Sequence, residues 1–286
     1  MTEVPLNDLA AAAIDGDRVA LTELVRRVQH PLYQLALQFL GHPQDAQDAT
    51  QEILVRLVTR LATFEGRAQF MTWAYTVATR ELLRTRKRLV ESSVRGAAPF
   101  AELLDRGLAA RDFTTDAAEY RLLCEEVRIS CTYGMLLCLS RPLRAAYLLG
   151  DVLGLTDIEG ASICDVTPAA FRQRLSRARR TIRHVVDNRC GLVDPANPCR
   201  CGRQIQSALD VGYLDRDRLA LAEHPRRPGD SLERRRLDTV ADQIDSAVAI
   251  GELYRADRFA APDEVWVQLQ RACPALFTDQ SRVDHG

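Results

Sequence analysis

The chain has 286 residues, 47% of them hydrophobic and 27% charged, and a formal net charge of −1. This length suggests two or three domains. No apolar run is long enough to cross a bilayer, which argues against an integral membrane protein, and the first residues lack the pattern of an export signal. We therefore expect a cytoplasmic protein whose eight cysteines are mostly reduced thiols.

The first part of the chain is expected to form four helices. Apolar residues recur at helical spacing over 6–30, and Pro31 is expected to restart a helix. A third helix is expected over 42–64, with acidic residues near its positive N-terminal end. The loop 64–69 separates it from a fourth helix over 70–88, which ends in a basic cluster.

The remaining chain also favours helices. Residues 89–116 lose the periodicity and are expected to be a linker with a short helix near 100–110, whereas a second helical block covers about 117–189. The Gly, Pro and Cys residues of 190–204 interrupt the pattern. Three helices are expected beyond them, over 205–222, 231–256 and 262–273. Because strand alternation and hairpin signals are missing, the sequence predicts an all-α protein.

Residues 155–186 indicate two helices joined by a short turn. Thr156 and Thr167 are good N-cap residues, and Pro168 suits a first helical position. The expected inward residues of the first helix are Ile158, Ala161 and either Ile163 or Cys164. Those of the second are Phe171, Leu175, Ala178 and Ile182.

The outer face of that second helix carries Arg172, Gln173, Arg174, Arg177, Arg179, Arg180 and Arg183. A helix presented by a short turn fits the major groove of DNA. Arginine can bind both acceptors of guanine, and glutamine can pair with adenine. We expect Arg172, Gln173 and Arg174 to contact bases, and Arg177 and Arg180 to contact phosphates. The alternative is an ordinary solvated basic helix.

A second set of candidate binding residues lies upstream of these helices. Asp45, Asp48 and Glu52 form an acidic stripe at helical spacing, with Gln51 beside them, although a solvated helix face would look the same. The next segment interleaves Phe64, Phe70, Trp73 and Tyr75 with basic residues. Rings and cations together suit unstacked single-stranded bases. Phe70 and Trp73 are the rings expected in the core.

Together these motifs resemble a known family. "DAQDATQEILVRLV" and "FEGRAQFMTWAYTVATRELLRTRKR" are similar to region 2 of bacterial sigma factors of the extracytoplasmic-function (ECF) group. "LSRPLRAAYLLGDVLGLTDIEGASICDVTPAAFRQRLSRARR" is similar to their region 4. The resemblance covers about residues 5–189. The chain departs from the family pattern at Val58, at Arg80 and at Ala169-Ala170-Phe171, which bears on promoter preference.

The resemblance implies a fold of two small helical domains, a region 2 bundle at 1–90 and a region 4 helix-turn-helix domain at 117–189. A linker at 91–116 joins them, and a helical, regulatory C-terminal extension follows at 190–286. The implied partners are core RNA polymerase, duplex and melted promoter DNA, and an anti-sigma factor or another regulator, with no membrane. The polymerase does the chemistry, so we expect neither catalysis nor a cofactor. The alternative is a stand-alone helix-turn-helix regulator that does not bind polymerase.

The resemblance also implies three sets of site residues. The residues implied to bind polymerase are Asp45, Asp48, Gln51, Glu52 and Arg56. Those implied to bind the melted minus-ten element are Phe64, Arg67, Gln69, Arg80, Arg84, Arg86, Lys87 and Arg88, with a flipped base captured by the loop. Those implied to bind the minus-thirty-five duplex are Thr167, Ala169, Arg172, Gln173, Arg174, Arg177 and Arg180.

The extension poses two separate questions. We expect no bound metal, but His184, Cys190, Cys199 and Cys201 could form a zinc site, and a redox-sensitive thiol pair or a purely structural turn are the other readings. Upstream of the extension, Cys124, Cys131 and Cys138 are expected as a buried small-residue stripe on one helix. One apolar helix face of the extension is formed by Leu237, Val240, Ile244, Val248 and Leu253. Such a face must pack on something, and we expect the extension to act on the sigma domains in cis.

Overall fold

The computed structural model describes residues 3–85, 96–109, 113–225 and 246–277. Its regular elements are helices, apart from one isolated parallel bridge between Cys190 and Cys199. The all-α prediction is therefore confirmed for these residues. Within them, no helix combines the length and apolarity needed to cross a membrane.

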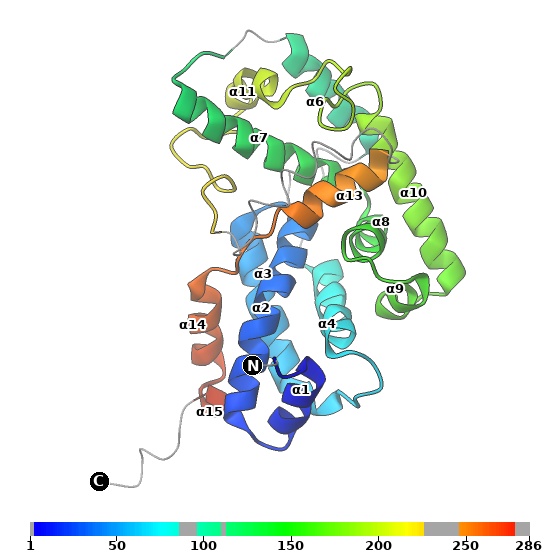
Figure 1. Cartoon of the computed structure of the whole chain (residues 1–286), viewed down its shortest axis with the longest axis vertical. Coiled ribbons are helices and arrows are strands. Elements are labelled where there is room, and N and C mark those ends of the chain that lie inside the picture. The colour runs from blue at the N-terminus through cyan, green and yellow to red at the C-terminus, as the bar shows by residue number, and fades with distance from the viewer. Residues whose placement is uncertain (1–2, 86–95, 110–112, 226–245, 278–286) are drawn as a thin grey trace.

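The N-terminal bundle consists of the first four helices and a short 3-10 turn (Figure 1). Its elements are α1 (Leu6–Ile14), α2 (Arg18–Leu40), α3 (Pro43–Thr59), η1 (Leu61–Thr63) and α4 (Phe70–Arg84).

The expected restart at Pro31 is wrong, because α2 continues through it. The break comes earlier, where Gly16 adopts a φ of 100° and the Asp17 carboxylate caps α2 by accepting the N–H groups of Val19 and Ala20 at 2.8 and 3.0 Å. Pro31 removes one helical hydrogen bond, which costs about 3 kcal/mol. The fully buried residues on both sides of it, such as Leu32, hold the helix in the core and offset that cost.

The second bundle contains α6 (Ala97–Ala109), α7 (Ala117–Leu137), α8 (Arg141–Tyr147), a π-helical turn η2 (Leu148–Val152), α9 (Asp157–Cys164) and α10 (Pro168–Val186). Part of the expected linker is thus a packed helix. Phe100, Ala101 and Leu104 of α6 are buried, and Phe100 lies against Gly134 of α7, where an added Cβ would come within 2.6 Å of its ring. The aromatic contact fixes this helix on the second bundle.

The tail, residues 190–286, adds α11 (Cys201–Asp210), α13 (Ser246–Ala256), α14 (Asp263–Ala272) and α15 (Pro274–Phe277). The prediction of a helix over 205–222 is wrong: the helix begins at Cys201 and ends before Gly212, whose φ is 69°. The predicted helix over 262–273 is confirmed. Of the expected apolar face, Leu237, Val240 and Ile244 lie outside the described residues, whereas Leu253 is buried.

The two bundles and the tail pack into one arrangement (Figure 1). Helix α4 packs against α9, and α2 packs against α7, so the bundles touch directly. The tail extends along both of them: α11 packs on α6 and α7, α13 on α10 and η2, and α14 on α3. A single apolar core includes buried residues from all three parts. We call this the closed arrangement.

Candidate nucleic-acid interface

Local capping builds the turn between α9 and α10. The Thr156 hydroxyl accepts the N–H of Glu159 at 3.2 Å, and the Glu159 carboxylate accepts the N–H of Thr156 at 2.9 Å. Bonds from Thr156 lower the pKa of the Glu159 carboxyl. The chain turns at Asp165, whose φ is 53°, and the Thr167 hydroxyl caps α10 by accepting the N–H of Ala170 at 3.2 Å. The predicted caps are confirmed.

Close packing of α9 on α10 depends on Gly160. A Cβ at this position would lie 2.2–2.7 Å from ring atoms of Phe171. Phe171, Ala178 and Ile182 are buried as predicted, and Leu175 is half-buried. The inward placement of Ile158 is wrong, because its side chain lies in the first turn of α9 and is 69% exposed.

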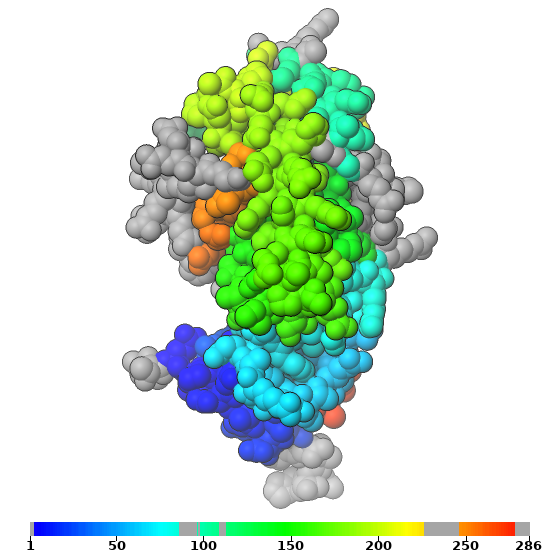
Figure 2. All heavy atoms as spheres, turned by 90° about the vertical axis from the view of Figure 1, so that its right-hand side faces the viewer, coloured from blue at the N-terminus to red at the C-terminus, as the bar shows by residue number. Residues whose placement is uncertain are grey.

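The outer face of α10 is open to solvent. Thr167, Ala169, Arg172, Gln173, Arg177 and Arg180 are exposed, and Arg174 is half-buried. A shallow hollow runs along the face between Ala169 and Arg180. Figure 2 looks onto this side, where α10 (yellow-green) runs down the middle of the surface and α13 (orange) lies beside it. The structure therefore brings this predicted set together on one accessible helix face.

Two arginines of α10 are paired with carboxylates. Arg179 binds Asp151 of η2 in a bidentate ion pair, with N–O distances of 2.9 and 2.5 Å. Asp151 is buried, so Arg179 anchors α10 to its own bundle and is not available to a groove. Arg172 pairs with Asp157 at the start of α9, but both side chains remain substantially exposed. This pair is weak enough to exchange for a base or phosphate.

The loop 64–69 differs in part from its prediction. The ring of Phe64 is buried against Phe70 and Trp73, with centroids 5.2 and 5.7 Å away, so it is not available to stack on a base in this arrangement. Arg67 is exposed and pairs with nearby Glu65. Gln69 is also exposed.

Asn7 of α1 fixes the end of this loop, a role that the sequence did not reveal. Its side-chain amide donates to the carbonyl of Ala68 at 3.2 Å and accepts the N–H of Phe70 at 2.8 Å. Beyond the loop, Arg80 and Arg84 are exposed on α4. Arg86, Lys87 and Arg88 lie outside the described residues.

The acidic stripe of α3 is only partly open. Asp48 and Glu52 are exposed, whereas Asp45 and Gln51 are half-buried. Arg56 forms ion pairs with Glu52 and with Glu81 of α4, both at 2.8 Å. Two carboxylates therefore remain accessible while α14 packs elsewhere on the same helix.

Two arginines of α8, which the sequence did not single out, join the bundles. Arg144 has no exposed surface; it donates to the carbonyl of Phe39 in α2 at 2.5 Å and to that of Leu136 in α7 at 2.8 Å. Arg141 donates to the carbonyl of Leu82 in α4 at 3.1 Å. These carbonyls belong to the C-terminal turns of helices, where the helix dipole favours a cation.

The residues suggested as zinc ligands do not all come together. His184 is exposed on α10 and lines a hollow with Arg183, Asp187 and Arg189. Over the described ranges, no group of three or more His, Cys, Asp or Glu side chains is already arranged to hold a metal ion.

Comparisons with known proteins agree with the resemblance. A sequence model for Sigma-70 region 2 matches residues 24–90. The chain is 30% identical over 171 residues to the ECF RNA polymerase sigma-E factor of Escherichia coli (strain K12), a match that covers 58% of this chain and 86% of that protein. It is 29% identical over 171 residues, with the same coverage, to the RNA polymerase sigma-H factor of Pseudomonas aeruginosa.

Two solved structures are also similar. One is CnrH in complex with the cytosolic domain of CnrY, at 22% identity over 63% of this chain and 96% of that chain, with a TM-score of 0.44. The other is the sigma factor RpoE of Bartonella quintana in complex with the anti-sigma factor NepR, at 17% identity over 58% and 96%, with a TM-score of 0.39.

Proposed function

The chain belongs to the ECF group of RNA polymerase sigma factors, and we propose that its tail controls this activity by holding the two DNA-binding bundles in the closed arrangement. As a sigma factor it binds core polymerase and directs it to promoters. The alternative of a stand-alone regulator that does not bind polymerase is not supported, because the matched relatives are polymerase sigma factors.

Within this activity we assign the surfaces as follows. The outer face of α10 binds the minus-thirty-five duplex, the loop 64–69 with Arg80 and Arg84 binds the melted minus-ten strand, and the stripe around Asp48 and Glu52 binds polymerase. None of these roles requires catalysis by this chain. An anti-sigma factor or another regulator, expected from the sequence, stays a candidate partner, and we place the activity in the cytoplasm.

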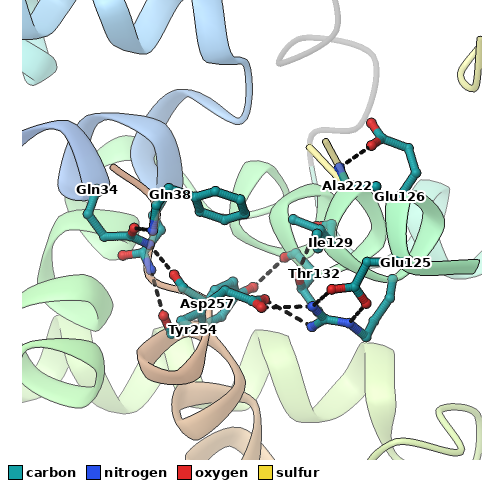
Figure 3. Close-up of polar contacts among 11 residues, drawn as sticks. Gln34, Gln38, Glu125, Glu126, Ile129, Thr132, Ala222, Tyr254 and Asp257 are labelled. Atoms are coloured by element: carbon teal, nitrogen blue, oxygen red, sulfur yellow. Dashed lines mark hydrogen bonds and ion pairs between the residues drawn. The ribbon is translucent and has the colours of Figure 1, made fainter. Parts of the chain in front are cut away.

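The observation that carries the proposal is the bridging segment, residues 254–261, which bonds to both bundles at once (Figure 3). The carbonyl of Tyr254 accepts the side-chain amide of Gln38 in α2 at 3.0 Å, while its hydroxyl donates to the carbonyl of Thr132 in α7. The carbonyl of Asp257 accepts from Gln34 in α2 at 2.7 Å, while its carboxylate binds Arg128 in α7.

The bridging segment is also buried. Phe259 has no exposed surface; its N–H donates to Gln34 at 2.6 Å, and its ring packs edge-on against Tyr133 of α7. The N–H of Ala261 donates to His30 of α2 at 3.0 Å. Opening the bundles would expose these apolar groups and break hydrogen bonds on both sides, which opposes separation.

Helix α13, which overlaps the start of the bridging segment, and helix α14, which follows it, extend the contact. In α13, the carbonyl of Ala247 accepts the Tyr147 hydroxyl at 2.6 Å, and Arg255 donates to the carbonyl of Val152 at 3.1 Å. In α14, Val265 and Leu269 are buried, and Trp266 lies under Arg26 of α2 with 5.2 Å to the ring centroid. The tail is thus fastened to the second bundle by α13 and to the N-terminal bundle by α14.

The closed arrangement is too compact for a promoter. The two elements are named for positions about 25 base pairs apart, which is ~85 Å of duplex at about 3.4 Å per base pair. Helices α4 and α9 pack directly against each other, and helices of this size span only about 12–23 Å at about 1.5 Å per residue. The bundles must therefore separate before both elements are bound, so we expect the tail to be inhibitory.

Substitutions on the α2 side test this without altering the tail or any DNA-binding residue. In the full chain, Gln34→Ala with Gln38→Ala removes hydrogen bonds to the bridging segment. We expect several-fold more run-off transcription from promoter DNA selected with the holoenzyme. Gln206→Ala is the matched control, because this half-buried glutamine donates to Asp210 within its own helix α11. Equal transcription by all three proteins would count against control by the tail.

A further inference from the structure

The loop 64–69 is open to solvent between two fixed ends. Residues 65–69 are all exposed, whereas Phe64 before them and Phe70 after them are buried. The two rings meet with centroids 5.2 Å apart, so the ends of the loop lie close together. Helix α1 (dark blue) lies beside this loop (Figure 1, Figure 2). The part of the loop that is available to DNA therefore stands between two anchored residues, next to α1.

Asn7 joins α1 to the second end of the loop. Its side-chain amide donates to the carbonyl of Ala68 at 3.2 Å, and its side-chain oxygen accepts the N–H of Phe70 at 2.8 Å. Gln69, the residue between these two, has an extended backbone with φ −62° and ψ 139°. One side chain thus fixes the backbone on both sides of Gln69.

The bond to Phe70 replaces an ordinary helix cap. Phe70 is the first residue of α4, and the N–H groups of a first turn have no partner within their own helix. An N-cap residue usually accepts one of them with its side chain, but within this described helix the N-cap residue, Gln69, accepts none. Asn7 provides the cap from 63 residues away. The side chain of Gln69 is therefore not used by α4 and stays available to a ligand.

The bond to Ala68 stabilises the loop and not the helix. Capping α4 requires only the side-chain oxygen of Asn7, whereas its NH2 group reaches back to the loop. Ala68 is exposed, so water can bond to its carbonyl when Asn7 does not, and the bond is not needed to satisfy a buried group. What this bond adds is a fixed direction for the chain between Ala68 and Phe70, and with it for the side chain of Gln69.

Asn7 is itself held on a rigid element. It lies in the first turn of α1, which packs against α2, α4 and η1, and Ala10 of this helix has no exposed surface. Arg27 of α2 donates to the carbonyl of Val4 at 2.5 Å, which fastens the chain just before α1. A side chain on a packed helix positions its partner more precisely than a side chain on a loop.

We propose that Asn7 is a positioning residue for base selection: it holds Gln69 so that the Gln69 amide binds the edge of a base captured by the loop. This role rests on the proposed function, in which the loop 64–69 binds the melted minus-ten strand. A flipped base is recognised by hydrogen bonds to its edge, and such bonds discriminate only when donor and acceptor are held in one direction. Without Asn7 the nearby arginines still attract the strand, but the loop accepts more than one base.

Binding of single-stranded minus-ten oligonucleotides to the holoenzyme tests this role. The oligonucleotides come from a promoter selected with the holoenzyme and carry each of the four bases in turn at every minus-ten position. We expect Asn7→Ala to lower the preference for the cognate base at one position about tenfold, as the loss of one or two hydrogen bonds would. Binding of the minus-thirty-five duplex should not change. Asp8→Ala, at an exposed position of the same turn, is the matched control and should keep wild-type selectivity.

Asn7→Asp separates base selection from folding. A carboxylate still accepts the N–H of Phe70 and suits the positive end of α4, so the melting temperature should stay at the wild-type value. It cannot donate to the carbonyl of Ala68, so the base preference should fall as in Asn7→Ala. Wild-type selectivity in both variants would overturn the role of Asn7. An equal loss of affinity for all four bases would overturn it as well, because that result indicates a structural role alone.

Gln69→Ala and Arg67→Ala test the loop itself. If neither variant alters single-strand binding, the assignment of the loop to the minus-ten strand is wrong, and the role of Asn7 fails with it. If Gln69→Ala loses base selectivity while both Asn7 variants keep it, only the role of Asn7 is overturned and the assignment of the loop stands. Loss of selectivity at the same position in Gln69→Ala and in both Asn7 variants supports the proposal.

Discussion

Gln34 and Asp257 are 223 residues apart in the chain, and the side-chain amide of Gln34 donates to the carbonyl of Asp257 at 2.7 Å. The same Asp257 offers its carboxylate to Arg128, which donates at 2.9 and 2.7 Å. One residue of the tail thus joins a helix of the N-terminal bundle to a helix of the second bundle. Much of the proposed control by the tail depends on this junction.

The Arg128–Asp257 pair should behave as a buried ion pair. Asp257 is only 1% exposed, so removing the Arg128 guanidinium from beside it should cost about 3–5 kcal/mol, whereas in Asp257→Ala the guanidinium keeps Glu125 as a partner and the cost should be smaller. We expect Arg128→Ala and Asp257→Ala each to lower the free energy of unfolding in urea, and the double variant to lose much less than the sum. Arg216→Ala, which breaks a more exposed pair with Glu119, is the control. If the free energy of unfolding of each single variant lies within about 0.5 kcal/mol of wild type, this ion pair does not stabilise the closed arrangement.

Duplex recognition should reside in α10. Alanine at Arg172 or Gln173 should cost about 1–3 kcal/mol of binding and relax specificity at one base pair, whereas alanine at Arg177 or Arg180 should lower affinity evenly and reduce the salt slope by about one unit. Binding isotherms of the holoenzyme on promoter variants at several salt concentrations measure both effects. If all four variants bind like wild type, α10 is merely a solvated helix.

Polymerase binding should depend on the exposed carboxylates of α3. We expect Asp48→Arg with Glu52→Arg to abolish co-purification with core polymerase, because two attractive charges become repulsive. The control is Asp15→Arg with Glu23→Arg, which makes the same charge change at exposed positions of the same bundle. Equal recovery of polymerase with both double variants would contradict the assignment.

Gly160 should be intolerant of a side chain. In Gly160→Ala, the new methyl group would overlap the ring of Phe171, and overpacking of this kind costs about 1–3 kcal/mol. Thermal unfolding should shift to lower temperature, and duplex binding should fall with it. Ser162→Ala, on an exposed position of the same helix, should change neither. A wild-type melting temperature for Gly160→Ala would mean that α9 and α10 are less tightly packed.

The sequence predicted those features that depend on neighbouring residues. The caps at Thr156 and Thr167, the turn between them and the basic outer face of α10 follow from spacing within about 30 residues, and all are present. Pro31 misled the prediction, because burial of α2 on both sides of it outweighs its lost hydrogen bond. Ile158 was wrongly predicted to face inward, because helical periodicity alone does not show where the neighbouring helix that would cover this side chain ends.

Contacts between distant segments could not be predicted in this way. Nothing in the pattern around Gln34 indicates that its amide bonds to Asp257 and Phe259. Phe64 carried the right motif for a DNA-binding loop, but its ring is buried by Phe70 and Trp73. Such placements depend on how the bundles and tail pack together, which is a property of the whole chain.

The distance between the two bundles is the most direct measure of whether the tail holds them together. Fluorophores on unnatural amino acids at the exposed positions Glu23 of α2 and Ser176 of α10 would report it by energy transfer in the full-length protein. We predict one short distance in the wild type and a population with a longer distance in Gln34→Ala with Gln38→Ala, or when core polymerase is added. An identical, already long distance in the wild type and the variant would show that the tail does not hold the bundles together.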